Sequence, residues 1–321
     1  MQYIGTMKFE SVVRPEHQDF SLLDSLVARF SYHSREEWEK LIVQEKLKIN
    51  GKVAGLESTV KKGDQILYLV ENYTEPEVPT HFEVIHEDDD FMLVDKPAGV
   101  PIHRTGRIFF NTFTSILRRH FDNEELSPMH RLDRDTGGLI LFAKNKDISA
   151  RFQKHLDKIL LKKIYIAVVH GRFPDHIHRV DMALQEKSDS EIRLKMHASP
   201  SGKASTTLFR LQKIIEKPFG LLEPPFSVLE AELITGRKHQ IRAHLSELGY
   251  PIVADRLYAH QGVYYKKMLN TPLTASDLAV LGSKHQMLHA YKVQLYLPHF
   301  KEAKYFESHA FHHEMKSILS L

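Results

Sequence analysis

The sequence predicts an α+β protein of two domains. A small α/β domain is expected over residues 1–76, and a larger domain over 77–321 with a mixed, mostly antiparallel sheet flanked by helices and loops. Three observations support this prediction. The length of 321 residues suits two domains better than one. Short strand-like runs outnumber the helices that a doubly wound sheet needs. Residues 71–79 hold two prolines and three glutamates with little periodicity, which is typical of a linker.

The first domain shows helical, turn and strand signals in turn. Apolar residues recur at helical spacing over 22–30. Ser34, with Glu37 three residues later, has the pattern of a capping box at the start of a second helix. Two short strands are expected on either side of the turn Asn50-Gly51. Residues 60–66 predict another turn that leads into a strand.

The second domain alternates short strand-like runs with a few helices. No internal repeat or low-complexity tract is present. The predicted strands are Phe91 to Val94, Leu139 to Phe142, Tyr165 to Val169, Thr206 to Leu211 and Val228 to Leu233, and the clearest helices are Thr112 to His120 and His239 to Leu248.

Charge is distributed unevenly along the chain. Residues 1–90 hold ten Lys and Arg against eighteen Asp and Glu, and residues 91–321 hold thirty-four against twenty-three, which together give the net charge of +3. A basic C-terminal portion is typical of a surface that binds polyanions, although many basic proteins bind no nucleic acid. Charge alone therefore leaves RNA binding open.

Composition excludes several classes of protein. Cysteine is absent, which rules out disulfides, thiolate nucleophiles and zinc held by sulfur, and suits a reducing cytoplasm. The chain has no run of eighteen apolar residues to span a membrane, and its start lacks the pattern of a secretory signal. We therefore expect a cytoplasmic protein without membrane contact.

Three segments carry side chains suited to chemistry, and the first runs from His130 to Leu139. Two carboxylates, Asp133 and Asp135, crowd with two guanidinium groups ahead of paired glycines that allow a close backbone approach. One interpretation is an ordinary charged surface turn before a strand. The other is a carboxylate that neighbouring cations keep ionised.

The other two segments are less specific by themselves. Leu233 to Leu245 predicts a strand, a Thr-Gly turn and a helix with a polar first turn. Such a helix start can bind phosphate, or can simply be a well-capped, solvated end. Lys163 to Val169 reads as a core strand, in which Tyr165 would ordinarily be a packing residue.

Histidines gather at two places, His176 with His178 and the segment 309–314. Two or three imidazoles without a fixed fourth ligand are a weak metal site, so we predict no metal. A metal-dependent hydrolase is kept as an alternative that loss of activity on chelation would support.

Six segments together form an ordered set of long motifs. They are Asp95-Lys96-Pro97-Ala98-Gly99, His130 to Leu139, Lys163 to Gly171, Thr235 to Leu245, Gly249 to Asp255 and Leu288-His289-Ala290. In kind and order they resemble the RluA-type pseudouridine synthases, whose motifs include H-R-L-D, T-S-G-L, K-x-Y-x-A-x-V-x-G and T-G-R-x-H-Q-I-R-x-H-L. The departures are small: Gly137 replaces the usual Ser, Asp95 the usual Asn, and Ala254 a common Gly.

The N-terminal domain resembles the S-four-type RNA-binding module first known from a ribosomal protein. The residues that match are the helix start Ser34-Arg35 and the turns Asn50-Gly51 and Gly63-Asp64, whereas Glu45 stands where a glycine is common. Because the segment is not net basic, RNA binding there would need a local face. Its expected members are Arg35, Lys46, Lys48 and Lys52.

The resemblance implies an isomerisation of uridine within RNA without redox change or net hydrolysis, so no cofactor is expected. It implies that Asp133 is the nucleophile. It also implies that Arg242 pairs with Asp133, and that Tyr165 stacks on the target base and helps to move the proton from carbon 5. Whether Asp133 attacks the anomeric carbon or assists glycal formation stays open.

The target uridine would have to be flipped out of the RNA. Arg131 would then fill the vacated stack, and the expected phosphate contacts are Lys96, Arg104, Arg134, Arg237 and His239. The N-terminal module favours large-subunit ribosomal RNA over tRNA as the partner of a monomeric enzyme. The alternative is a non-catalytic RNA-binding assembly factor, which would be expected to have lost Asp133, Tyr165 or Arg242, and all three are present.

Overall fold

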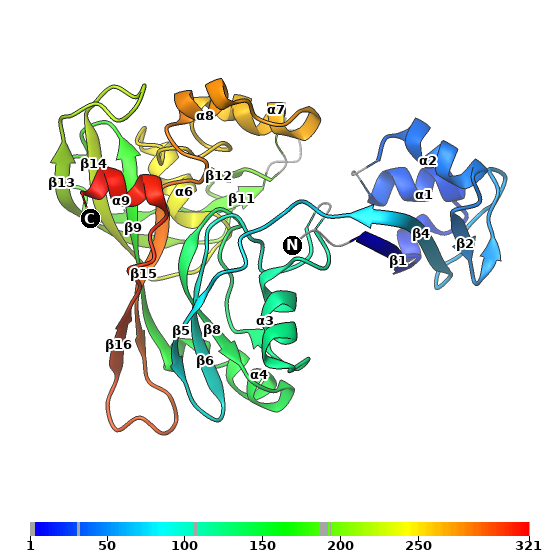
Figure 1. Ribbon diagram of the computed structural model, residues 1–321, viewed down its shortest axis with the longest axis horizontal. Coiled ribbons are helices and arrows are strands. Elements are labelled where there is room, and N and C mark those ends of the chain that lie inside the picture. The colour runs from blue at the N-terminus through cyan, green and yellow to red at the C-terminus, as the bar shows by residue number, and fades with distance from the viewer. Residues whose placement is uncertain (1–3, 31–32, 106–107, 187–191, 193, 321) are drawn as a thin grey trace. The chain divides into compact units, whose positions relative to one another are not determined.

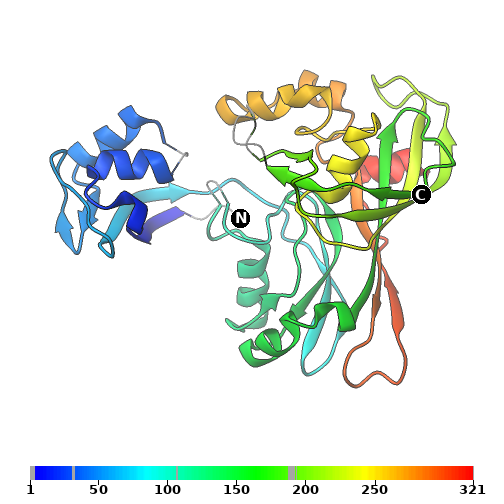
Figure 2. The same cartoon turned by 180° about the vertical axis from the view of Figure 1, so that it is seen from behind.

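A computed structural model gives the fold and describes residues 4–30, 33–105, 108–186, 192 and 194–320. The chain divides into two compact units. The small unit comprises Met1–Val78 and Arg104–Asn111, and the large unit comprises Pro79–His103 and Thr112–Leu321. Figures 1 and 2 show the ribbon from opposite sides. The sequence did not predict that Arg104–Asn111 returns to the first unit.

The small unit is a four-stranded antiparallel sheet with two α-helices, in the strand order β1-β4-β2-β3. Its elements are β1 (Ile4–Val12), the 3-10 helix η1 (Pro15–His17), α1 (Leu22–Arg29), α2 (Arg35–Val43), β2 (Leu47–Ile49), β3 (Lys52–Val53) and β4 (Gln65–Thr74).

The two helices of the small unit begin at capped residues. Ser21 Oγ accepts a hydrogen bond from Asp24 N at 3.0 Å at the start of α1. At α2, Ser34 Oγ accepts from Glu37 N at 3.2 Å and Glu37 Oε2 accepts from Ser34 N at 2.7 Å, so the predicted capping box is confirmed. Both helices bury their apolar side against the sheet, and Trp38 lies at the centre of this core.

The prediction of a linker over residues 71–79 is wrong for its first half. Strand β4 continues to Thr74 and pairs with β1. Glu75 is then 1% exposed, and its carboxylate accepts three backbone hydrogen bonds of 2.7–2.8 Å, from Phe109, Phe110 and Asn111. Strand pairing and these bonds override the composition, which had suggested a solvated segment.

We expect Glu75→Gln to destabilise the small unit. An amide has only one acceptor oxygen, so its NH₂ group would face a backbone N–H and leave a buried donor unpaired, at a cost of about 1–3 kcal/mol. Trp38, the single tryptophan of the chain, reports unfolding of this unit by fluorescence in a urea titration. The matched control is Glu77→Gln, because Glu77 is exposed. Equal midpoints for the two variants would contradict the prediction.

The large unit is built on a sheet of ten strands. In chain order its elements are β5 (Glu83–Glu87), β6 (Phe91–Lys96), α3 (Phe113–Phe121), β7 (Ser127–Pro128), β8 (Gly137–Ala143), α4 (Lys146–Gln153), α5 (Leu156–Ile159), β9 (Leu160–His170), β10 (Arg179–Asp181), β11 (Leu184–Glu186), β12 (Met196–Ala198), β13 (Thr206–Ile215), β14 (Phe226–Leu233), α6 (Gln240–Glu247), the 3-10 helix η2 (His260–Gly262), α7 (Val263–Asn270), α8 (Ala275–Leu281), β15 (Leu288–Leu295), β16 (Lys304–Glu307) and α9 (His313–Leu319).

The main sheet has the order β10-β13-β14-β9-β15-β8-β6-β5, with β16 added to β15 and β7 to β8. Among the strand pairs described, β15 with β8 is parallel and the others are antiparallel, which confirms the predicted mixed, mostly antiparallel sheet. The parallel pairing covers only His289 with Gly137 and Ala290 with Gly138. This short junction joins two arms: the β8 arm (β8, β6, β5, β7) and the β15 arm (β15, β16, β9, β14, β13, β10).

An apolar core lies between the two arms, beside their junction, and is formed by residues of β6, β8, β9 and β15. Leu139 and Leu141 of β8 pack in one cluster with Leu160 of β9 and with Val293 and Leu295 of β15. The predicted strand runs all lie in observed strands, and the two predicted helices correspond to α3 and α6. No helix among the described residues is long and apolar enough to cross a bilayer.

Candidate active site

Asp133 lies in the turn immediately before β8, where two glycines fix the path of the chain. Gly138 has a φ of +108°, and a Cβ there would lie 2.3 Å from the carbonyl oxygen of Ala290. Only glycine therefore allows β8 to approach β15 at this point, as the paired glycines had suggested. The result is that the Asp133 turn is held at the junction of the two arms.

The turn before α6 is held by the buried side chain of Gln240, which is 2% exposed. Its Oε1 accepts hydrogen bonds from Arg237 N at 3.0 Å and from the Thr235 hydroxyl at 2.8 Å. Its Nε2 donates to Thr206 O and to Thr207 Oγ1, both at 2.9 Å. These bonds anchor the helix start to β13 and occupy the Arg237 N–H, which is then not available to a phosphate.

Arg242, on the first turn of α6, is 8% exposed and lies between two carboxylates. Its Nη1 donates to Asp133 Oδ2 at 2.6 Å. Its Nε and Nη2 donate to the two oxygens of Asp255, at 2.7 and 2.9 Å. Asp255 is fully buried and also accepts the backbone N–H groups of Leu257 and Tyr258. Asp255 therefore fixes the guanidinium plane so that its remaining edge points at Asp133.

The electrostatics of this group favour an ionised Asp133. Burial pushes its pKa up, but His239 and Arg242 outweigh this, and the pKa lies below its ordinary value. His239 Nε2 is 3.7 Å from Asp133 Oδ1. Burial lowers the pKa of His239 itself to about 4, so its ring is neutral at pH 7. At neutral pH the charge that holds the carboxylate in its anionic form is therefore the Arg242 guanidinium.

A cavity of about 580 Å³ opens at the Asp133 carboxylate. Its lining includes the three predicted catalytic residues, Asp133, Tyr165 and Arg242, which lie far apart in the sequence. Among the described residues that line it, Asp133 is the one carboxylate. The arrangement therefore suits chemistry that uses a single carboxylate, and does not offer the paired carboxylates of a glycosidase.

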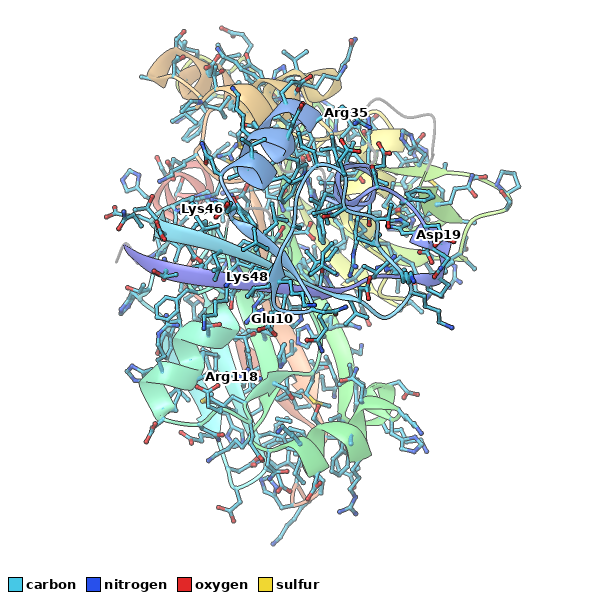
Figure 3. The ribbon with its side chains drawn as sticks, turned by 90° about the vertical axis from the view of Figure 1, so that its right-hand side faces the viewer. Glu10, Asp19, Arg35, Lys46, Lys48 and Arg118 are labelled. Carbon is cyan, nitrogen blue, oxygen red and sulfur yellow. The ribbon has the colours of Figure 1, made fainter. Side chains whose placement is uncertain are left out.

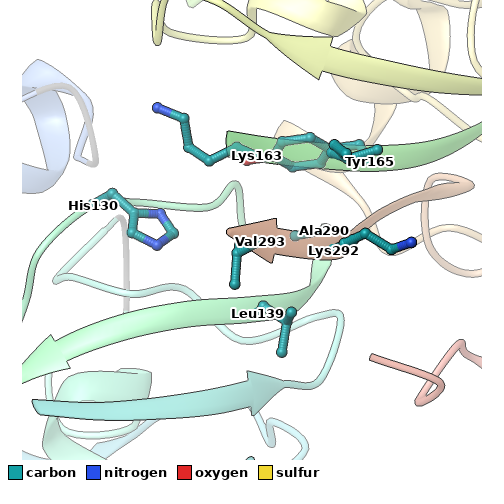
Figure 4. Close-up of a pocket in the computed structure, with 8 residues that line it drawn as sticks. His130, Leu139, Lys163, Tyr165, Ala290, Lys292 and Val293 are labelled. Carbon is teal, nitrogen blue, oxygen red and sulfur yellow. The ribbon is translucent and has the colours of Figure 1, made fainter. Parts of the chain in front are cut away.

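Tyr165 is presented to the cavity by β9 and is 6% exposed. Burial raises the pKa of its hydroxyl, and the Asp133 carboxylate raises it further, so the phenol is protonated at neutral pH. Figure 4 shows Lys163 and Tyr165 together on β9, with His130 from the turn before β8. The sequence had not singled out the side chains of Lys163 and His130, which line the same cavity.

The predicted RNA contacts of the large unit fall into two groups. Arg131, Arg237 and His239 line the cavity. Arg131 and Arg237 are exposed, and the Nε of Arg237 donates to Ala204 O at 3.1 Å. Arg134 is also exposed, does not line the cavity, and donates to Gly99 O at 3.2 Å.

The predicted phosphate contact of Lys96 is corrected by the structure. Lys96 has no exposed surface, and its ammonium group donates to the carbonyls of Pro97, Val100 and Arg134 at 2.9, 3.0 and 3.3 Å. Burial lowers its pKa to about 7. Lys96 is therefore a structural residue whose amino group ties the end of β6 to the Asp133 turn. Asp95 beside it is 3% exposed, and burial raises its pKa to about 6.

Three of the predicted contacts of the small unit, Arg35, Lys46 and Lys48, are labelled in Figure 3. Arg35 forms an ion pair with Asp24, and Lys46 forms one with Glu71 at 3.1 Å. Lys48 is half-buried in β2, and Arg104 is exposed. Their contact with RNA stays a prediction.

Comparison with known proteins identifies the family. Residues 90–247 match the family described as RNA pseudouridylate synthase, and residues 22–66 match the S4 domain. An uncharacterised RNA pseudouridine synthase of Synechocystis is 30% identical over 246 residues, which cover 75% of this chain and 80% of that one. The chain belongs to the RluA-type RNA pseudouridine synthase family. Its members are isomerases that act on RNA, and the resemblance seen in the motifs is confirmed.

Two other relatives are named for different RNA substrates, one for tRNA and one for ribosomal RNA. The mitochondrial tRNA pseudouridine(32) synthase of Saccharomyces cerevisiae is 31% identical, over 80% of this chain and 54% of that one. The ribosomal large subunit pseudouridine synthase C of Buchnera aphidicola is 32% identical, over 57% and 55%. The chain thus spans about half the length of these two relatives.

The structure of human RNA pseudouridylate synthase domain containing 1 shares the fold of this synthase. It aligns with a TM-score of 0.54 and 23% identity, over 73% of this chain and 85% of that one. The α+β fold predicted from the sequence is thereby confirmed.

We expect the pKa of Asp133 to rise by ~1–3 units when its cation is removed. The double variant Arg242→Gln/Asp255→Asn removes the guanidinium without leaving Asp255 as an unpaired buried charge. In the wild type, Asp133 should stay ionised as pH falls through the ordinary Asp range and protonate below it, whereas in the variant it should protonate at higher pH. NMR titration of carboxyl-labelled aspartate measures this. Arg237→Gln, which removes another cation of the cavity, should leave the pKa unchanged, and an unshifted pKa in the double variant would contradict the pairing.

Proposed function

We propose that this synthase isomerises uridine through Asp133 as its nucleophile, and that its substrate is large-subunit ribosomal RNA. The observation that carries the first part is the Asp133 carboxylate, bonded to Arg242 at 2.6 Å and open to the cavity, and its lowered pKa favours the ionised form. The second part rests on the N-terminal S4 domain and on the similarity to the Buchnera enzyme.

The reaction needs one nucleophilic carboxylate and a site in which the base can turn. The bond from uracil nitrogen 1 to the ribose breaks, the base rotates, and carbon 5 joins the ribose. Carbon 5 loses its proton and nitrogen 1 gains one, so the net change is an isomerisation. Atoms and electrons balance without a redox partner or net hydrolysis. Asp133 would either attack the anomeric carbon or assist formation of a glycal, and its ionised form serves both routes.

Arg242 and Asp255 would support Asp133 without contacting the sugar. A buried anion is costly without a partner, and the guanidinium supplies both charge and direction. Asp255 would act as a positioning residue through Arg242. Because its hydroxyl is protonated at neutral pH, Tyr165 would relay the carbon 5 proton rather than remove it as a free phenolate.

The target uridine must leave the RNA stack to reach Asp133. A cavity of about 580 Å³ is within the range of small-ligand sites and can hold a single nucleotide. Extrusion costs on the order of a few kcal/mol, and Arg131, which is exposed and lines the cavity, would fill the gap left in the RNA.

We expect Asp133→Asn to abolish pseudouridine formation, because an amide keeps the shape of the carboxylate but is not nucleophilic. RNA binding should stay near the wild-type level. Release of tritium from RNA labelled at uridine carbon 5 measures turnover. Asp135→Asn is the matched control: this carboxylate is two residues away but does not line the cavity, and bonds His285 instead. Measurable turnover by Asp133→Asn would rule out the proposed nucleophile.

We expect Tyr165→Phe to keep stacking on the base and to lose proton transfer. Since general acid–base groups contribute about 10²–10⁴-fold, turnover should fall by that order while RNA affinity is retained. Single-turnover kinetics and a binding titration separate the two effects. Wild-type turnover would show that the hydroxyl has no role.

The substrate is tested by mapping pseudouridine across cellular RNA with and without the gene. We expect the loss of sites in large-subunit ribosomal RNA. Loss confined to tRNA would favour the alternative that the yeast relatives suggest, and an unchanged map together with intact RNA binding would favour a non-catalytic assembly factor.

A further inference from the structure

We propose that His86, Asp88 and His299 form a binding site for a divalent transition-metal ion that joins the two arms of the sheet. His86 lies in β5 and Asp88 in the β5–β6 turn, on the β8 arm. His299 lies in the β15–β16 connection, on the β15 arm. All three lie in the large unit and outside the lining of the active-site cavity.

Two of the three donor-atom spacings are close to those of a tetrahedral metal site. Asp88 Oδ2 lies 3.2 Å from His86 Nε2 and 3.4 Å from His299 Nε2, and all three donors lie within 4.8 Å of one another. Zinc bonds of about 2.0–2.1 Å place two ligand atoms of a tetrahedron about 3.3–3.4 Å apart. Charge-assisted hydrogen bonds are shorter, about 2.7–2.9 Å. The two contacts are therefore longer than typical charge-assisted hydrogen bonds and close to the edges of a metal site, although the His86 contact at 3.2 Å is also within hydrogen-bond range.

Asp88 is held in the orientation that a ligand needs. Its other oxygen, Oδ1, accepts the backbone N–H groups of Asp90 and Phe91 at 2.8 and 2.7 Å. This leaves Oδ2 directed at the two imidazoles. A ligating carboxylate is characteristically fixed by such hydrogen bonds to its second oxygen. The site is thus organised before an ion binds.

The surroundings allow an ion to enter. The side chains of His86, Asp88 and His299 are 23%, 14% and 50% exposed, which leaves room for water as a fourth ligand. His86 packs against Phe300 and Phe306, which gives the site an apolar wall. The nearby ammonium of Lys144 opposes a cation, but it is paired with Glu87 at 2.8 Å. The run Glu87-Asp88-Asp89-Asp90 makes the local charge negative.

The place of the site indicates a structural role. In the part of the chain that the structure describes, strand pairing between the two arms is limited to the short junction of β8 with β15, and beyond it the arms are joined by apolar packing. The β5–β6 hairpin and the β15–β16 hairpin extend in the same direction from this junction in Figures 1 and 2. A metal ion held by both hairpins would cross-link the arms at the end remote from Asp133.

The test is zinc binding by the full chain after treatment with EDTA and dialysis. Calorimetric titration with ZnCl₂ should give one saturable equivalent for the wild type, and His299→Ala should weaken it at least tenfold. His299 is half-exposed, so this variant should fold, and circular dichroism checks that it does. His178→Ala, which removes an exposed imidazole elsewhere in the unit, should bind as the wild type does.

Two further measurements separate a built site from non-specific binding. Co²⁺ in place of zinc should give the visible absorption of a tetrahedral ion in the wild type and lose it in His299→Ala. Zinc should raise the unfolding temperature of the wild type and leave that of His299→Ala unchanged. Absence of saturable zinc binding by the wild type, or equal affinity in the two proteins, would overturn the proposal.

Discussion

The ion pair of Asp133 with Arg242 is the interaction on which the site depends. Neither charge is stable alone in a buried setting, and breaking such a pair by removing one partner typically costs about 3–5 kcal/mol. Asp255 completes the arrangement by binding the other edge of the guanidinium. The same three side chains therefore hold the Asp133 turn against α6 and keep the carboxylate ionised, so the fold and the proposed chemistry share one set of bonds.

The ion pair forms only if the Asp133 turn and the start of α6 are held close together in a fixed geometry. Gly138 allows β8 to approach β15 at the Asp133 turn, and Gln240 ties the start of α6 to β13. Lys96 adds a third fixed point by binding the carbonyl of Arg134 next to the nucleophile. Buried polar groups whose hydrogen bonds are satisfied hold the two segments in fixed positions, and the Asp133 carboxylate therefore lies at the cavity.

The parts of the site that the sequence could predict are those carried by long local motifs. Asp133, Tyr165 and Arg242 each lie inside such a motif, and local patterns also predicted β6, β8, β9, β13 and β14, the helices α3 and α6, and the capping box. Burial of Lys96 and Glu75 could not be predicted, because composition makes both look solvated and only tertiary packing supplies their partners. The cluster of His86, Asp88 and His299 has no local pattern at all, since its third member comes from a distant hairpin.

Not all of the basic residues of the second domain are available to bind RNA. Arg242 and Lys96 are buried. Arg242 donates its hydrogen bonds to carboxylates and Lys96 donates to backbone carbonyls, so both stabilise the fold and do not contact phosphate. Arg131 and Arg237 at the cavity, with Arg134 nearby in sequence, remain exposed. The cations available to RNA are therefore fewer than the formal charge indicates, and those at the cavity surround the carboxylate that the flipped uridine would have to reach.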